Sequence, residues 1–242
     1  MVPLQRRLCP RAGPARLPAF DPRRTHMTIA PVKHRVSHRD KVETAILGEA
    51  VRQFAECGYE GTSIATVAER AGLSKQNLMY YFPTKQALYQ RVLDNVLDDW
   101  LARMASLADP GEAPGDVLRA YVRAKLTFSR EQPLASRVYA MEVIGGAKLY
   151  ADQIRRRVIP LLRADIAVFE RWIAEGKIAP VNATHLLFAV WAMTQSYADF
   201  AAQMTLVLDR EQLTPSDFDD AERLITGMVL AAVGLQENTC PP

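Results

Sequence analysis

The stretch TSIATVAERAGLSKQNLMYYF, residues 62–82, is the most informative part of the chain. Apolar residues recur at helical spacing from Ile64 to Ala71, and Thr62 or Ser63 can cap that helix. Gly72 then predicts a turn before a second short helix. This order is typical of a helix-turn-helix, in which the second helix enters the DNA major groove. The stretch therefore indicates DNA binding, although an ordinary helical hairpin with a solvated polar face has the same spacing.

The second of these helices carries the side chains that we expect to contact DNA. Leu78 and Phe82 are four residues apart and should pack inward, so that Lys75, Gln76 and Asn77 point outward. Gln and Asn can pair with adenine, and Lys can reach guanine acceptors or a phosphate. Nearby tyrosines, Lys85 and the backbone amides of the capped helix ends suit phosphate contacts. The predicted DNA-binding residues are Thr62, Ser63, Ser74, Lys75, Gln76, Asn77, Met79, Tyr80, Tyr81 and Lys85.

The rest of the chain predicts helices and no strands. Val42, Ile46, Ala50 and Phe54 recur every four residues, in an amphipathic helix that ends at Gly58. No stretch alternates apolar and polar residues as a half-buried strand would, and no Asn-Gly or Asp-Gly hairpin turn is present. We therefore predict an all-α fold. Later helices are expected from residue 85 to beyond 100 and over about 116–131, 134–144, 149–175 with a kink or split at Pro160, 183–207 and 215–235.

Charge is distributed unevenly along the 242 residues, whose formal net charge is +3. Residues 1–41 hold ten Lys or Arg and two Asp, a net charge of +8, while residues 42–90 carry −1 and residues 91–242 carry −4. The basic segment is rich in proline and lacks a helical period, so we expect residues 1–38 to form a disordered arm. A basic arm favours a polyanionic partner, although a solubilising tail would look the same. Lys33, Arg35, Arg39 and Lys41 are the candidates for extra DNA contacts.

Composition argues against several other classes of protein. With 49% hydrophobic and 24% charged residues, a folded, water-soluble chain is expected. The most apolar run is shorter than the ~20 residues that cross a membrane. The three cysteines lie far apart without a CxxC pair, and His34 and His38 have no third ligand, so we expect no disulfide framework, no metal and a cytoplasmic location. No GxSxG elbow or HExxH pair indicates an enzyme.

The residues around the predicted helix-turn-helix carry a family resemblance. The segments that carry it are FAECGYEGTSI at 54–64, VA at 67–68, AGLS at 71–74, YYF at 80–82, and Leu78, Lys85 and Leu88. Over about residues 38–90 the chain resembles the DNA-binding domain of the TetR family. Membership implies a dimeric, usually repressing transcription factor whose C-terminal helices form a ligand pocket and a dimer interface. The expected domains are thus the arm 1–38, a DNA-binding domain 39–90, and a ligand-binding and dimerisation domain 91–242.

The resemblance extends into the second half of the chain. The segments that carry it there are NLMYYFP at 77–83, DDWL at 98–101, KL at 125–126, SR at 129–130, ASR at 135–137, ME at 141–142 and WAMTQSYADFA at 191–201. They are similar to the RutR group, regulators of pyrimidine utilisation that sense uracil or thymine. The chain departs from that group at 144–154 and 209–220.

Trp100, Trp191 and Gln195 are the predicted ligand-binding residues. Gln195 lies one turn after Trp191 on the same helix face, so its amide enters the same apolar interior and needs hydrogen-bond partners. Helix neighbours could satisfy the amide, and so could a planar heterocycle. The two tryptophans could also be plain core residues. With the resemblance, we expect the helices that begin near residues 85, 116, 149 and 183 to enclose a cavity.

Small and apolar residues on the last two predicted helices indicate the dimer interface. They are Ala198, Ala201 and Ala202 on one helix and Leu224, Met228, Ala231, Ala232 and Leu235 on the other. The sequence therefore predicts a homodimeric, ligand-responsive regulator that binds double-stranded operator DNA, senses a small molecule such as uracil or thymine, and needs no cofactor. Two alternatives stay open. One is a DNA-binding regulator with a different or no small-molecule effector, and the other is an enzyme or helical scaffold that does not bind DNA.

Overall fold

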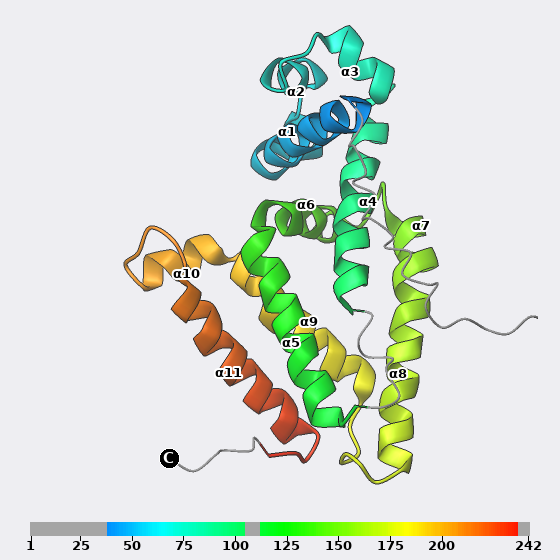
Figure 1. The fold of residues 1–242 in the computed structure, drawn as a ribbon, viewed down its shortest axis with the longest axis vertical. Coiled ribbons are helices and arrows are strands. Elements are labelled where there is room, and N and C mark those ends of the chain that lie inside the picture. The colour runs from blue at the N-terminus through cyan, green and yellow to red at the C-terminus, as the bar shows by residue number, and fades with distance from the viewer. Residues whose placement is uncertain (1–37, 105–111, 237–242) are drawn as a thin grey trace, which may run out of the picture. The chain divides into compact units, whose positions relative to one another are not determined.

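Every regular element in residues 38–104 and 112–236, the part of the chain that the computed structural model describes, is helical (Figure 1). The predicted all-α class is confirmed. None of the described helices is long and apolar enough to span a membrane. Residues 1–37 lie outside the described part, and with them most of the predicted arm, including Lys33 and Arg35.

The first four helices follow the pattern that the sequence predicts. They are α1 (His38–Gly61), α2 (Ile64–Arg70), α3 (Lys75–Tyr81) and α4 (Lys85–Met104). Gly58 interrupts the helical geometry of α1 with φ of 69°, a conformation that favours glycine. Thr84 starts α4, since its hydroxyl oxygen accepts a hydrogen bond from the amide of Ala87 at 3.0 Å. Helix α1 begins four residues before the predicted Val42, with Asp40 in its first turn, where a negative charge stabilises a helix.

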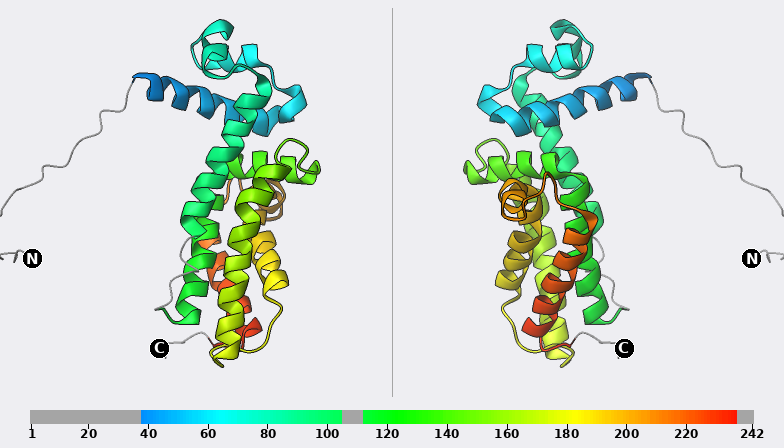
Figure 2. Two further views of the ribbon diagram at one scale, coloured as in Figure 1. Left: turned by 90° about the vertical axis from the view of Figure 1, so that its right-hand side faces the viewer. Right: turned by 90° about the vertical axis from the view of Figure 1, so that its left-hand side faces the viewer.

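Helix α4 leaves the DNA-binding helices and enters the C-terminal bundle without a break (Figures 1 and 2). Its buried Leu88, Val92 and Leu93 belong to the same apolar cluster as Phe54 of α1. That cluster also takes in Val138, Tyr150 and Val158 from the C-terminal half, and α1 packs against α6. The helices on either side of residue 90 therefore share one core.

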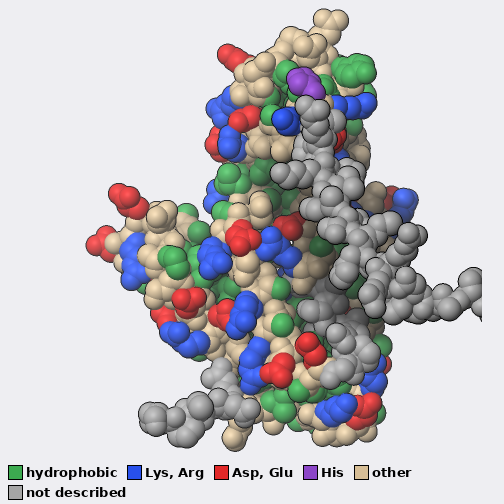
Figure 3. All heavy atoms as spheres, in the orientation of Figure 1, with side chains coloured by type: hydrophobic (Ala, Val, Ile, Leu, Met, Phe, Trp, Pro, Cys, Tyr) green, Lys and Arg blue, Asp and Glu red, His purple; other side chains and the backbone are tan. Residues whose placement is uncertain are grey.

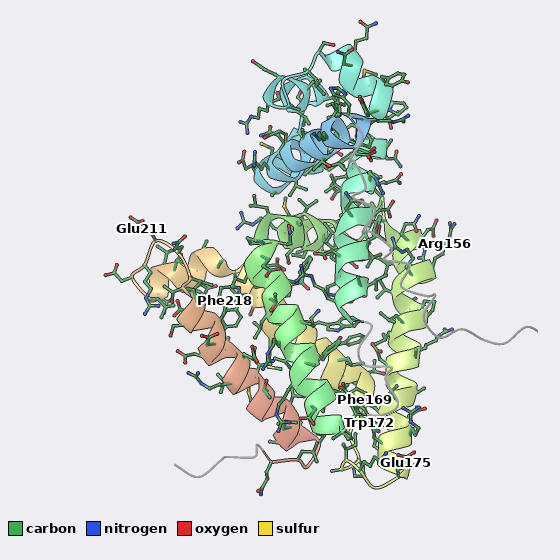
Figure 4. The ribbon with its side chains drawn as sticks, in the orientation of Figure 1. Arg156, Phe169, Trp172, Glu175, Glu211 and Phe218 are labelled. Carbon is green, nitrogen blue, oxygen red and sulfur yellow. The ribbon has the colours of Figure 1, made fainter. Side chains whose placement is uncertain are left out.

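The C-terminal half is built around α5 (Pro114–Glu131), which packs against α4, α9 and α11. The other helices are α6 (Pro133–Ile144), α7 (Ala151–Gln153), a π-helical turn (Ile154–Val158), α8 (Ile159–Ala174), α9 (Ala183–Asp199), α10 (Ala201–Val207) and α11 (Pro215–Ala232). Phe169 and Trp172 on α8 join the core of this half, as does Phe218 on α11 (Figure 4). On the solvent side, charges of both signs alternate over α5 and α11 (Figure 3), where Arg123 pairs with Glu222 at 2.7 Å.

Two of the long predicted helices are divided. The split expected near Pro160 is confirmed, and the π-helical turn directly precedes that proline, which lacks the N–H of a regular helical bond. The continuous helix predicted over 183–207 is wrong, because Phe200 leaves the helical conformation with ψ of 18° and separates α9 from α10. The periodicity of the sequence runs on across Phe200, so it could not indicate this break.

Candidate DNA-binding helices and effector cavity

Helices α2 and α3 present the side chains that the sequence assigns to DNA. The Ser63 hydroxyl oxygen accepts a hydrogen bond from the amide of Ala65 at 3.2 Å, and that of Ser74 accepts one from the amide of Asn77 at 3.1 Å. Gly72, with φ of 71°, reverses the chain between the two helices. Leu78 is fully buried beneath α3, as predicted. Of the predicted DNA-binding residues, the exposed ones are Ser63, Ser74, Lys75, Gln76, Asn77, Met79 and Tyr80, while Tyr81 and Lys85 are half-buried.

The exposed face of α3 continues into an aromatic and basic edge. Tyr80 is 76% exposed, and its ring meets that of Tyr81 edge-on, with 5.7 Å between the centroids. The Arg39 guanidinium lies 5.9 Å from the centre of the Tyr81 ring. Arg39 and Lys41 are both exposed on the first turn of α1. This edge offers cations and hydroxyl groups next to the helix that carries Gln76 and Asn77.

Thr62 and Lys85 were predicted to contact DNA, Thr62 through the backbone amides near it, and the structure engages both side chains in contacts within the protein. Thr62 is 4% exposed, and its hydroxyl donates toward the carbonyl of Gly58 at 2.7 Å. The Lys85 ammonium donates to the carbonyls of Glu60 and Thr62, each at 3.2 Å, and lies 4.6 Å from the centre of the Tyr59 ring. These contacts join α4 to the end of α1. The two hydrogen bonds of Lys85 join residues that are 25 and 23 positions apart in the sequence, so a local sequence pattern could not predict them.

The predicted ligand residues Trp100, Trp191 and Gln195 meet at one cavity of about 70 Å³. The two indole rings stand edge to face, with 5.6 Å between their centroids. The Trp191 indole N–H donates to the Tyr121 hydroxyl at 2.6 Å, so this ring is held in place and presents its face rather than a donor. Helix α6 also lines the cavity, which the sequence did not predict. The remaining lining residues are Val96, Leu97, Lys125, Phe128, Ser129, Ser136, Tyr139 and Val158.

Lys125 is a cavity residue that sequence reasoning missed as a site residue. It is 4% exposed, and its ammonium lies 4.5 Å from the centre of the Trp100 ring and 5.7 Å from that of Trp191. Burial lowers the pKa of Lys125 to about 7. A signal for it was present, because Tyr121, Lys125 and Ser129 are spaced by four residues on the core face of an amphipathic helix.

Asp199 of α9 connects two of the polar cavity residues. Its carboxylate accepts a hydrogen bond from the Ser136 hydroxyl at 3.0 Å. Burial raises the pKa of Asp199, and hydrogen bonds from Ser136 and Gln195 partly offset that rise. Gln195 therefore lies beside Asp199 at the cavity wall.

Comparison with known proteins identifies the family. Residues 46–92 match the model for bacterial regulatory proteins of the tetR family, and residues 93–236 match the model for the YcdC-like protein, C-terminal region. The chain belongs to the TetR family. It is 43% identical to the HTH-type transcriptional regulator RutR of Escherichia coli (strain K12) over 163 residues, which cover 67% of this chain and 76% of RutR. It is 23% identical over 189 residues to the uncharacterized regulator YuxN of Bacillus subtilis (strain 168), covering 77% and 64% of the two chains.

Solved structures of TetR-like proteins share the fold. AibR in complex with isovaleryl coenzyme A and operator DNA superposes with a TM-score of 0.60 at 20% identity, covering 77% of this chain and 97% of AibR. The ketosteroid regulator KstR2 of Mycobacterium tuberculosis gives a TM-score of 0.65 at 18% identity, covering 81% and 95%. With its helix-turn-helix domain, this TetR-family chain is a DNA-binding transcriptional regulator, not an enzyme.

Lys85→Ala should lower the stability of the regulator and leave the salt dependence of DNA binding unchanged. We expect a loss of about 1–2 kcal/mol in the free energy of unfolding, since two hydrogen bonds from a charged donor are removed at a partly exposed site. Chemical denaturation and DNA titration at several salt concentrations measure the two quantities.

Lys75→Ala is the matched control for Lys85→Ala. It removes an exposed lysine of α3, so it should leave stability unchanged and reduce the salt slope by about one charge per subunit. If Lys85→Ala kept its stability and lost salt slope instead, Lys85 would be a phosphate ligand.

Proposed function

We propose that this TetR-family regulator is a homodimeric repressor whose affinity for its operator is controlled by a pyrimidine base, or a similarly small planar molecule, held in the cavity that Trp100, Trp191 and Gln195 line. The observation that carries the proposal is the cavity, which brings together two indole rings and the amide of Gln195. A cavity volume of about 70 Å³ is small, which favours a single small ring over a long chain. The resemblance to the RutR group, which senses uracil or thymine, points to the same class of effector.

The polar groups of the cavity match the edge of a pyrimidine base. Such a ring can stack on an indole, while its carbonyl and N–H groups pair with side chains at its rim. Gln195 offers an amide for that pairing, and Lys125 offers an ammonium for a ring carbonyl. The rest of the wall is largely apolar, which favours a flat ring over a sugar or a peptide.

DNA recognition rests on the exposed face of α3. Lys75, Gln76 and Asn77 extend from the first turn of that helix, where a recognition helix contacts base edges. Tyr80 and Arg39 lie beside them and suit phosphate contacts. Two copies of α3 in a dimer would read half-sites about one helical turn apart or slightly more.

The exposed apolar face of α10 and α11 supports the predicted dimer interface. Leu206 is 82% exposed and Leu224 is 62% exposed, and Ala202 and Ala232 lie on the same two helices. An apolar patch that would otherwise face water marks an interaction surface. Ala198, predicted to be part of this face, is fully buried inside the subunit and is therefore not available to a partner.

Helix α4 is the route by which the effector would act on DNA. Val96, Leu97 and Trp100 line the cavity, and the first turns of the same helix pack on α1. A ligand shifts such an equilibrium only by binding one arrangement of the helices better than the other. We therefore expect the pyrimidine to favour a dimer in which the two α3 helices no longer match the operator half-sites.

Asn77→Ala should remove base discrimination at one operator position, at a cost of roughly 1–3 kcal/mol for the preferred sequence. Selection of bound DNA fragments and titration with single-position operator variants measure this. A uniform loss over all sequences would assign Asn77 to the phosphate backbone instead.

Uracil or thymine should bind with micromolar affinity in titration calorimetry. Cytosine should bind less tightly, because its ring edge presents a different pattern of hydrogen-bond donors and acceptors. Trp191→Ala should abolish binding, since it removes one wall of the cavity. Gln195→Leu should weaken binding about tenfold, because a buried hydrogen bond to the ring is lost. Binding of none of the three bases would contradict the pyrimidine assignment, and unchanged binding by Gln195→Leu would remove the amide as an anchor.

Ala232→Glu should yield monomers that bind operator DNA poorly, because it places a charge in the proposed apolar interface. Sedimentation velocity measures the oligomeric state. Ala174→Glu, at an exposed position at the end of α8, is the matched control and should leave the dimer intact. A dimeric Ala232→Glu variant would place the interface elsewhere.

A further inference from the structure

Lys125 is the one cationic side chain that lines the effector cavity in the described part of the chain. Lys125 is 4% exposed. No described residue forms an ion pair or a hydrogen bond with its ammonium. Among the described residues, its specific contacts are with the faces of Trp100 and Trp191. A buried charge without an anionic partner is costly, and cation–π contacts offset only part of that cost. The ammonium thus lacks the partner that its burial demands.

Two hydroxyl groups in the wall already donate hydrogen bonds within the protein. The Ser129 hydroxyl donates to the carbonyl of Thr194 at 2.9 Å, and the Ser136 hydroxyl donates to Asp199 at 3.0 Å. Gln195 lies near enough to Asp199 to lower the pKa of that carboxyl, and its amide has two N–H donors, so at least one is left for a ligand. Lys125 is therefore the strongest donor left for a ligand in this wall, and it supplies a positive charge that nothing in the described wall neutralises.

We propose that Lys125 determines the specificity of the cavity by selecting planar cyclic imides that bind as their anions, with the ring N–H proton transferred to the lysine amine. The inference rests on the proposed function, since it concerns the effector of the same site. The regulator would then discriminate between ligands by the acidity of the ring N–H as well as by the shape of the ring. In the transfer, the N–H bond of the imide breaks, an N–H bond forms at Nζ of Lys125, and the ammonium faces the delocalised imide anion.

The pH dependence of binding distinguishes a complex in which the ring and Lys125 share one proton, as in this ion pair, from a neutral ring bound to the ammonium. With a pKa of about 7, lowered by burial, Lys125 is mostly protonated at pH 6 and mostly neutral at pH 8 in the free protein. At pH 6 the free ammonium and the free imide carry two protons between them, whereas the ion pair carries one. Binding at pH 6 therefore releases one proton to the solvent, and the affinity falls. A neutral ring bound to the ammonium holds two protons, so its affinity would fall at pH 8 instead.

Other titratable groups on the helices of this half of the chain must be separated from Lys125. They are Asp99 and Arg103 on α4, Tyr121 on α5, Tyr139 on α6, Asp165 on α8 and Asp199 on α9. Asp99 and Arg103 pair with each other, and burial raises the pKa of both tyrosines further above the neutral range. Asp165 is the group to control for, because burial raises its pKa to about 7.

The first test uses rings of nearly equal shape and different acidity. Titration calorimetry at pH 8 compares uracil with 5-fluorouracil and 6-azauracil, both of which have a more acidic ring N–H. We expect both to bind more tightly than uracil, and Lys125→Met to bind all three with equal, weak affinity. Equal affinities in the wild-type protein would overturn the proposal while leaving the pyrimidine effector in place. Binding of no ring at any pH would contradict the proposed function itself.

The second test compares uracil binding at pH 6 and pH 8. We expect about tenfold tighter binding at pH 8, from one proton released at pH 6 by a group with a pKa near 7. Lys125→Met should lose this dependence, and Lys148→Met, which removes an exposed lysine outside the cavity, should retain it. Tighter binding at pH 6 would overturn the proposal, and a dependence that persists in Lys125→Met would assign it to Asp165. Thermal melting confirms that each variant is folded.

Discussion

Helix α4 has to bury apolar side chains in two places at once, and the rest of the structure depends on this constraint. Its first half packs Leu88 and Leu93 against the DNA-binding helices, while its second half places Trp100 at the cavity. Because a helix is stiff over this length, a shift at one end has to be accommodated at the other. The helix-turn-helix and the helices around the cavity are therefore joined through one core rather than through a flexible linker.

Polar contacts hold α4 to the helices beside the cavity. The Tyr150 hydroxyl donates to Asp94 of α4 at 2.7 Å, and Arg157 pairs with Asp94 and Asp98. On α6, Glu142 is buried and accepts a hydrogen bond from the amide of Leu149 at 2.7 Å. Hydrogen bonds and ion pairs have a more fixed geometry than apolar packing. They therefore limit α4 to a small number of positions, and a ligand would stabilise one of these positions over the others.

The buried ammonium of Lys125 shows where stability and function compete in this protein. An apolar residue at this position would remove the cost of burying a charge, and the core around it would pack well without it. The cost of burying this charge would be offset if the effector supplied its ionic partner. Effector binding would then stabilise the folded chain as well as alter its affinity for DNA, because the ligand supplies a partner that the protein lacks.

Contacts between near neighbours in the chain are what the sequence alone could predict. The capping of α3 by Ser74, the burial of Leu78 and the turn at Gly72 follow from spacings of a few residues, as does the all-α class. The meeting of Trp191 with Gln195 followed in the same way, because one turn of helix separates them. Family resemblance added Trp100, which lies on another helix.

Only the tertiary structure decided the roles that depend on which helix faces meet. Lys85 looked like a free cation beside the recognition helix, yet its ammonium binds the carbonyl of Glu60, 25 residues earlier. Lys125 entered the sequence analysis only within a segment of family resemblance, yet its ammonium lies against indoles of α4 and α9. Periodicity shows that a face is buried but not what lies against it. The partner of a polar group is set by packing over long sequence separations, so the chemistry of this cavity could be read only after the fold was known.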